Sequence, residues 1–317
     1  MADGALWDWQ VGVFGRNEAS RIGQCIASIA RAGRGLRVLA TVLLNGATDD
    51  SAGIALQAAK AGALPIEIYR FGHADKSNAI NRFFYDLRAP ADAVCCVDAY
   101  AVIGPDSLSG FARAFADRPD ARLATGIAIN GRSEPRAVEK TLTVGGVTHG
   151  QLYAPGRAFI DRLTGRGLRL PLGLYRGDGL LGSMAAHDLD PLSCPWENRR
   201  VVGVRDATYE IASLSPFRPA DVRRHLHRRV NHMRGRLETA AIKEIIYAHG
   251  YAALPERADD MIRAYLSAHG PLPTPLRDRP FMAAALRRVR SARPPDPASL
   301  IPALVASAGT AARPVSP

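Results

Sequence analysis

The sequence predicts an α/β fold: a mostly parallel, Rossmann-like β-sheet with helices on both faces, followed by a C-terminal helical appendage. The alternation of two kinds of segment supports this prediction. In the first half of the chain, short apolar runs alternate with segments whose apolar residues recur at helical spacing. Strands and helices that alternate in this way form right-handed βαβ units. Ligands bind such sheets at the carboxyl ends of the strands, so polar residues there are candidates for a site.

Six segments are predicted to be strands, because they are short, apolar and followed by turn-forming or polar residues. They span residues 10–14, 36–44, 65–71, 93–99, 122–129 and 199–212. Two helical faces lie between them, formed by Ile22, Cys25, Ile26 and Ile29 and by Ile80, Phe83, Phe84 and Leu87.

The later part of the chain is less regular. Residues 130–198 are rich in Gly and Pro but contain two short helical patterns, PGRAFIDRLTG and DGLLGSMAAHDL. Residues 218–250 predict one long basic helix, or two with a break near Gly235, and a further helix ends at Gly270. We expect an α/β domain at 1–215, a basic helical region at 216–290 and a disordered Pro- and Ala-rich tail at 291–317.

Composition indicates a globular protein, since 47% of the 317 residues are hydrophobic and 22% are charged. The net charge of +11 comes almost entirely from Arg. Arg binds phosphates in bidentate fashion, so nucleotide diphosphates, nucleic acid or acidic lipid headgroups are candidate partners, although a coding bias toward Arg explains the charge equally well.

The cysteines Cys25, Cys95, Cys96 and Cys194 lack the spacing of a zinc site or disulfide framework. Cys95 and Cys96 are expected on opposite faces of one strand. A signal peptide and long apolar stretches are also missing, which predicts a cytoplasmic protein. The Arg-rich helices would allow peripheral contact with the inner membrane.

Polar residues follow the first two predicted strands. Asn17 and Glu18 come after the first strand, where they either cap the next helix or face a ligand. Asn45 begins a tight turn after the second strand. Asp49 then either caps a helix or accepts a hydrogen bond from a base or ribose.

The third and fourth strands lead to the sharper candidates. Lys76 and Asn78 begin a helix, where a cation needs a compensating anion: a bound diphosphate or the neighbouring Asp75. Asp98 ends a wholly apolar strand, and a carboxylate in that position should face a cleft, a metal ion or ribose hydroxyls. Asp178, between two glycines, is either a helix cap or a general base.

Taken in order, these segments resemble glycosyltransferase family 2, whose domain has the fold called GT-A. VGVFGRNEASRIGQCIASI is similar to the family's opening strand and helix, and LNGATDDSAG to its second-strand motif. HADKSNAINRFF is similar to its Lys-and-Asn segment, and CVDAYAVIGPDSL stands in the place of its Asp-x-Asp motif. The resemblance covers residues 9–130 well and extends more loosely to 240.

The resemblance implies a nucleotide-diphospho-sugar donor and a saccharide or lipid-linked acceptor, as in the synthesis of cell-envelope polysaccharide. It also implies a divalent metal, Mg²⁺ or Mn²⁺, at Asp98. The pair Gly177-Asp178 matches the family's Glu-Asp pair, which makes Asp178 the catalytic base. Predicted donor-binding residues are Asn17, Glu18, Asn45, Asp49, Lys76, Asn78, Asp98, Tyr100, Arg228 and Arg234, and predicted metal ligands are Asp98 and His232.

The sequence departs from the family in three places. Tyr100 replaces the second Asp of the Asp-x-Asp motif, which weakens the expectation of a metal, and Gly177 replaces a Glu. The Gln-x-x-Arg-Trp pattern of processive members is missing, since the corresponding stretch reads RRVNHMRG. We therefore expect a single transfer rather than polymer synthesis.

The expected mechanism is an in-line displacement with inversion, in which Asp178 deprotonates the acceptor hydroxyl. It requires Asp49, Lys76, Asp98 and Asp178 to share one pocket. Two alternatives stay open: a nucleotidyltransferase of related fold, and a degenerate domain that binds a nucleotide-sugar without turnover. Nucleic acid is not an expected partner, because no aromatic residue lies between Phe217 and Tyr247 in the most basic segment.

Overall fold

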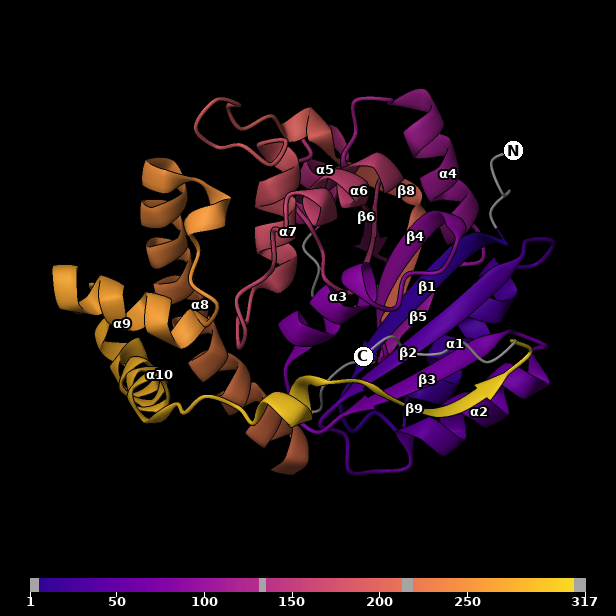
Figure 1. Cartoon of the computed structure of the whole chain (residues 1–317), viewed down its shortest axis with the longest axis horizontal. Helices are drawn as coiled ribbons and strands as arrows, with labels where there is room; N and C mark the ends of the chain where they lie inside the picture. The colour runs from indigo at the N-terminus through magenta and orange to yellow at the C-terminus, as the bar shows by residue number, and fades with distance from the viewer. Residues whose placement is uncertain (1–5, 131–134, 213–218, 311–317) are drawn as a thin grey trace.

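The computed structural model describes residues 6–130, 135–212 and 219–310. A nine-stranded sheet with the order β5-β8-β6-β7-β4-β1-β2-β3-β9 lies at its centre (Figure 1). The strands are β1 (Trp7–Gly15), β2 (Val38–Asn45), β3 (Ile66–Phe71), β4 (Ala91–Asp98), β5 (Ala101–Ile103), β6 (Leu123–Ala128), β7 (Leu152–Pro155), β8 (Val201–Ile211) and β9 (Ala303–Ala308). The strands β5, β7 and β9 run antiparallel to their neighbours and the other pairs are parallel, which confirms the predicted mostly parallel sheet.

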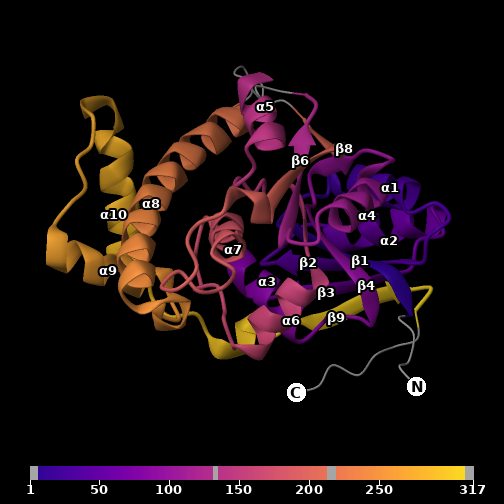
Figure 2. The ribbon, with the colours of Figure 1, turned by 90° about the horizontal axis from the view of Figure 1, so that it is seen from above.

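Helices cover both faces of the sheet, as predicted (Figure 2). One face packs against α1 (Ile22–Ala32), α2 (Ser51–Ala61) and α4 (Ser107–Asp117), and the other against α3 (Lys76–Tyr85), α6 (Arg157–Gly165) and α7 (Gly177–Ala186). A further helix, α5 (Pro135–Thr143), contacts β6 and β8.

The central strands supply side chains to both cores. Val11 and Val13 of β1 belong to one hydrophobic core, and Phe14 belongs to the other. Cys95 and Cys96 likewise lie on opposite faces of β4, as predicted. Burial on both faces explains why these strands appear in the sequence as nearly continuous apolar runs.

The C-terminal helices α8 (Pro219–His249), α9 (Ala258–His269) and α10 (Arg279–Ser291) gather at one end of the molecule (Figure 1). They share a small core that includes Met233, Ile262 and Val289. The second half of α8 instead joins the core of the sheet domain. The predicted break near Gly235 is absent, because α8 runs through it; a Cβ atom there would lie 2.6 Å from Nε of Arg176.

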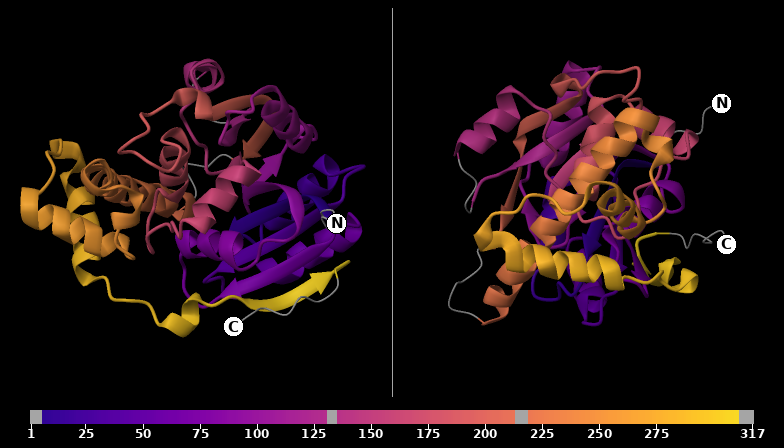
Figure 3. Two further views of the ribbon diagram at one scale, coloured as in Figure 1. Left: turned by 45° about the horizontal axis from the view of Figure 1, so that its top comes forward. Right: turned by 90° about the vertical axis from the view of Figure 1, so that its left-hand side faces the viewer.

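The prediction of disorder from residue 291 onward is wrong for the described part of that tail. The chain returns from α10 along the molecule, and β9 pairs with the outer edge of β3 (Figures 1 and 3). Asn78 donates from Nδ2 to the carbonyl oxygen of Leu300 at 2.9 Å and helps to hold this segment. Pairing satisfies backbone groups that an open sheet edge would expose. Residues 311–317 lie outside the described residues.

Within the described residues, no helix has the length and apolar character needed to cross a membrane. The four cysteines are free thiols. The cytoplasmic location and the peripheral membrane contact expected from the sequence remain predictions.

Candidate active site

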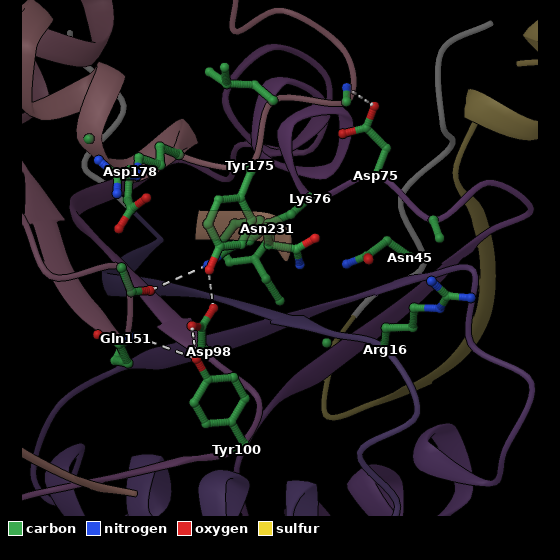
Figure 4. Close-up of a pocket in the computed structure, with 18 of the residues that line it drawn as sticks. Arg16, Asn45, Asp75, Lys76, Asp98, Tyr100, Gln151, Tyr175, Asp178 and Asn231 are labelled. Carbon is green, nitrogen blue, oxygen red and sulfur yellow. Dashed lines mark hydrogen bonds and ion pairs between the residues drawn. The ribbon is translucent and has the colours of Figure 1, made fainter. Parts of the chain in front are cut away.

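A cleft of about 830 Å³ opens at the carboxyl ends of β1, β2 and β4 (Figure 4). Its wall comes from the strand ends, the start of α3, the segment before β7, the start of α7 and the middle of α8. It includes Arg16, Glu18, Asn45, Asp75, Lys76, Asp98, Tyr100, Gly150, Gln151, Tyr175, Arg176, Asp178, Asn231 and His232. Parallel strands that end at one edge explain why segments far apart in the sequence meet here.

Asp98 is the carboxylate at the base of this cleft. Its side chain is only 8% exposed, so its charge needs close partners. The Lys76 ammonium forms an ion pair with Oδ1, and the Tyr100 hydroxyl donates to Oδ2 at 2.8 Å. Both carboxylate oxygens are therefore bound by side chains of this chain.

Lys76 is the first residue of α3, at a helix end that disfavours a cation. Asp75 caps the helix by accepting hydrogen bonds from the backbone nitrogens of Ser77 and Asn78. Burial alone would lower the pKa of Lys76, but the carboxylates of Asp98 and Asp178 outweigh that effect and hold the pKa above its ordinary value. The side chain is therefore an ammonium at neutral pH.

A chain of hydrogen bonds continues from Asp98 across the edge of the sheet. The amide nitrogen of Gln151 donates to the Tyr100 hydroxyl at 3.4 Å, and the Tyr209 hydroxyl donates to the Gln151 oxygen at 3.3 Å. Burial and then the Asp98 charge raise the pKa of Tyr100, and burial above all raises that of Tyr209 to about 12. Both hydroxyls stay protonated, so Tyr100 remains a donor to Asp98.

Asp178 lies in the first turn of α7, on the side of the cleft near Gln151 (Figure 4). Its carboxylate packs against Gly150, where a Cβ atom would lie 2.5 Å from Oδ2 of Asp178. Glycine at position 150 is thus required for this carboxylate to occupy its place. The negative charge of Asp178 also acts on Lys76, which links the two sides of the cleft electrostatically.

Helix α8 fixes the loop that leads into α7. Glu238 is fully buried and accepts hydrogen bonds from the backbone nitrogens of Tyr175 and Arg176. Burial raises the pKa of Glu238, although these amides and Arg234 oppose the rise. Arg234 binds Glu238 at 2.9 Å and Asp259 at 2.7 Å. This network holds the backbone immediately before Asp178.

The structure brings part of the predicted set together. The predicted residues that line the cleft are Glu18, Asn45, Lys76, Asp98, Tyr100, Asp178 and His232. Those that lie outside its wall are Asn17, Asp49, Asn78, Arg228 and Arg234. The expectation of a pocket shared by Asp49, Lys76, Asp98 and Asp178 is therefore wrong for Asp49.

Local hydrogen bonds explain why the side chains of Asp49 and Asn17 do not line the cleft. Asp49 accepts from the Ser51 hydroxyl at 2.6 Å and from the Ala19 nitrogen at 2.9 Å. Burial pushes the pKa of Asp49 upward, but these bonds bring it below its ordinary value. Asn17 does not cap α1; its side-chain oxygen accepts from the Thr48 nitrogen at 2.8 Å. Asn and Asp side chains often form such local bonds in turns.

Several residues of the cleft were not among the predicted site residues. They are Arg16, Asp75, Gln151, Tyr175, Arg176 and Asn231, among others. Arg16 lies two residues after the first predicted strand, so its position in the sequence was a usable signal. Gln151 and Tyr175 lie in the irregular stretch without periodicity, and Asn231 sits among many polar residues of α8, so the sequence offered no comparable signal for them.

The family model described as "Glycosyl transferase family 2" matches residues 11–167 of this chain. That segment contains the second half of β1, all of β2 to β4, and the strand ends that carry Glu18, Asn45, Lys76 and Asp98.

Residues 11–167 belong to glycosyltransferase family 2. Solved glycosyltransferases share the fold. The mannosyltransferase PcManGT from Pyrobaculum calidifontis superposes with a TM-score of 0.58 at 18% identity, over 93% of this chain and 79% of its own. TarS from S. aureus superposes with a TM-score of 0.53 at 15% identity, over 89% and 80%. No curated protein sequence matches this chain significantly.

The family membership makes the chain a glycosyltransferase, and the similar structures show that its fold is GT-A. One of its departures from family 2, the glycine at position 177, lies in a tightly packed place. Gly177, where the family has Glu, is buried, and a Cβ atom there would lie 3.2 Å from Oγ of Ser77 and 3.3 Å from a methyl group of Leu170. A larger side chain at this position requires these neighbours to shift.

The residues present do not fit a resident divalent metal. Metal ions of this kind need free carboxylate oxygens, and those of Asp98 are bound to Lys76 and Tyr100. No group of three or more His, Cys, Asp or Glu side chains in the described parts of the chain has the arrangement of a metal site. His232, the other predicted ligand, accepts a hydrogen bond at Nδ1 from the Arg176 guanidinium.

Proposed function

We propose that this glycosyltransferase moves a sugar from a nucleotide-diphosphate donor to an acceptor hydroxyl, in a single transfer and with inversion at the anomeric carbon. The observation that carries the proposal is the presence of Asp178 and the Lys76–Asp98 pair in one cleft at the carboxyl edge of a family 2 domain. A carboxylate and an ammonium in one cleft supply the base and the counter-charge that this reaction needs.

The donor would lie along the sheet edge. Its nucleoside would sit near Arg16 and Asn45, and its diphosphate would extend to Lys76, which the high pKa keeps charged. Two of the similar structures carry GDP-mannose or UDP-GlcNAc, which supports a nucleotide-sugar as the donor class. The acidic Glu18 in the same wall is a candidate contact for ribose hydroxyls or a base N–H group.

In the proposed step, the Asp178 carboxylate takes the proton from the acceptor hydroxyl. The hydroxyl oxygen attacks the anomeric carbon, and the bond from this carbon to the diphosphate oxygen breaks, with its electron pair leaving on the diphosphate. Attack from the face opposite the leaving group inverts the configuration. The packing of Asp178 against Gly150 limits where the base can lie, which contributes orientation.

The leaving diphosphate gains negative charge as this bond breaks. Lys76 is placed to meet that charge, and Arg16 and Arg176 add two guanidinium groups in the same wall. We therefore propose that protein cations stabilise the leaving group. The missing Gln-x-x-Arg-Trp pattern supports a single transfer.

The direct experiment incubates the protein with UDP-, GDP- and TDP-sugars and follows release of nucleoside diphosphate, first in water and then with candidate acceptors. We expect one nucleotide class to be hydrolysed slowly and to be consumed faster with an acceptor, with an inverted anomeric centre in the product. Tight donor binding without any release would contradict catalysis and favour a nucleotide-sugar-binding protein. Release of inorganic pyrophosphate from a sugar phosphate and a nucleoside triphosphate would favour a nucleotidyltransferase.

A further inference from the structure

A second cavity of about 590 Å³ lies beside α8, against the 3₁₀ turn Leu276–Asp278 that precedes α10. Four arginines and two histidines contribute to its wall: Arg228, Arg229, Arg236, Arg277, His225 and His232. His232 also lines the active-site cleft, so the two cavities meet at this side chain.

Positive charge exceeds negative charge in this cavity. Among the described residues of the cavity wall, one carries a carboxylate, Asp278. Arg229 forms an ion pair with it at 2.8 Å. Arg236 donates to the neutral carbonyl oxygen of Pro273 at 2.8 Å, and no carboxylate in the described parts of the chain forms an ion pair with it. Arg228 is exposed and has no ion-pair partner among the residues that the structure describes. Guanidinium groups held on a concave surface are suited to phosphate or carboxylate groups.

The second cavity meets the cleft on the side of Asp178. His232, at the junction, accepts a hydrogen bond from Arg176, which lies two residues before Asp178. Arg16 and Asn45, at the proposed nucleoside end, lie on the other side of Asp98 (Figure 4). A ligand in the second cavity would thus approach the reacting centre from the side opposite the nucleoside.

Electrostatics also connect the two cavities. Burial raises the pKa of Tyr175, and the charge of Arg228 partly offsets this rise. The same charge acts on the Tyr100 hydroxyl at the base of the cleft. Arg228 and His232 are four residues apart, slightly more than one helical turn, or about 6 Å along α8. A compound that spans both cavities therefore needs only the length of a small sugar or polyol.

We propose that the second cavity binds an anionic group of the acceptor, a phosphate monoester or a carboxylate, while a hydroxyl of the same molecule reaches Asp178. This inference rests on the proposed sugar transfer and names its acceptor class. The acceptor is then a small hydroxylated anion, such as a sugar phosphate, a polyol phosphate or a hydroxy acid. Arg228 and Arg236 hold the anionic group and orient the hydroxyl that is glycosylated.

The transfer experiment compares acceptors in matched pairs, using the best donor. The pairs are glycerol with glycerol 3-phosphate and glucose with glucose 6-phosphate, and glycerate tests the carboxylate. We expect the anionic member to be preferred by about tenfold or more in kcat/KM, as charged hydrogen bonds allow. Arg228→Gln should raise the KM of the anionic acceptor about tenfold. Arg34→Gln, an exposed arginine after α1, is the matched control.

Equal use of charged and neutral acceptors would overturn the proposal. So would an Arg228→Gln variant whose loss falls on the donor KM, because Arg228 would then belong to the donor site. Calorimetric titration with glycerol 3-phosphate, at saturating nucleoside diphosphate, separates this inference from the proposed function. Binding that Arg228→Gln abolishes supports the anion site even if no sugar is moved, whereas absence of binding to the wild-type protein in an active preparation rejects the anion site alone.

Discussion

The carboxyl edge of the sheet and helix α8 both carry charged residues that the sequence presents as ligand contacts. At the sheet edge Glu18, Lys76 and Asp98 share one cleft, whereas the residues of α8 are divided between different surroundings. Lys76 and Asp98 come from different βα units and form an ion pair there. On α8, Arg234 is tied to Glu238 and Asp259, Arg228 lines a second cavity, and His232 lies between the two cavities.

The difference teaches how position in an element limits what a side chain can reach. Parallel strands end at one edge of the sheet, so the residues that follow them lie close together even when they are far apart in the sequence. A helix turns by about 100° per residue, so Arg228 and Arg234 point about 120° apart. Which of them is available to a ligand depends on what packs against each face of α8. Arg234 is not available, because it forms ion pairs with the carboxylates of Glu238 and Asp259.

The largest expected effect tests the structural role of Arg234. Arg234→Met removes the guanidinium that faces Glu238, whose side chain is fully buried. An unpaired buried charge costs about 3–5 kcal/mol, so the free energy of unfolding should fall by that amount in urea denaturation. Arg228→Met on the same helix should change it by less than about 0.5 kcal/mol, as exposed sites do. Equal losses in both variants would remove the distinction drawn between the two arginines.

The next effect concerns the cation at the sheet edge. Lys76→Met should lower kcat/KM for sugar transfer about 10²- to 10³-fold, because the leaving diphosphate loses a positioned charge. Lys76→Arg should recover part of this loss. Lys60→Met, on the exposed face of α2, is the matched control for charge removal. Thermal melts establish that the Lys76 variants are folded, and a Lys76→Met enzyme as active as Lys60→Met would contradict the role of this ammonium.

A smaller effect should follow from crowding the proposed base. In Gly150→Ala, the new methyl group would lie 2.5 Å from Oδ2 of Asp178 and would push the carboxylate aside. A displacement of about 1 Å costs up to roughly a hundredfold in rate, so we expect kcat to fall ten- to a hundredfold. Gly165→Ala, where a Cβ atom meets nothing within 4 Å, is the control. An unchanged kcat in Gly150→Ala would show that the position of Asp178 does not limit the reaction.

The smallest effect is expected from chelation. Because Lys76 and Tyr100 bind the oxygens of Asp98, EDTA should change turnover of the wild-type enzyme by less than about twofold. In Lys76→Met, the freed Asp98 oxygen becomes able to bind a cation, and added Mn²⁺ should raise the residual activity. Complete loss of wild-type turnover with EDTA, restored by Mn²⁺, would contradict this interpretation of the Asp98 surroundings.

Much of the fold was predictable because its signals are local. The buried strands β1 to β4 and the helices between them are encoded by the spacing of apolar residues, which any short window of sequence reveals. The strand β9 is different, since ALVASA lies in a Pro-rich tail and gains its order from pairing with the edge of β3. Such a contact between distant segments has no local signal.

The site residues that come shortly after predicted strands or at predicted helix starts could be identified from the sequence. Lys76, Asp98 and Asp178 meet as expected, but Asp49 does not, because a nearby serine and a backbone amide satisfy its carboxylate. Gln151 enters the site through the packing of β7 beside β4, which the apolar pattern did not indicate. Side chains that arrive through tertiary packing need the fold before they can be assigned.

The most direct test of the central claim measures donor binding and sugar transfer together in Asp178→Asn. The variant should bind the nucleotide-sugar with nearly wild-type affinity, while transfer falls by about 10²- to 10⁴-fold, since a general base has been removed. Asp260→Asn, another first-turn carboxylate, located on α9 and outside the cleft, should transfer at the wild-type rate. Transfer that survives in Asp178→Asn, or that disappears together with donor binding, would contradict the assignment of Asp178 as the base.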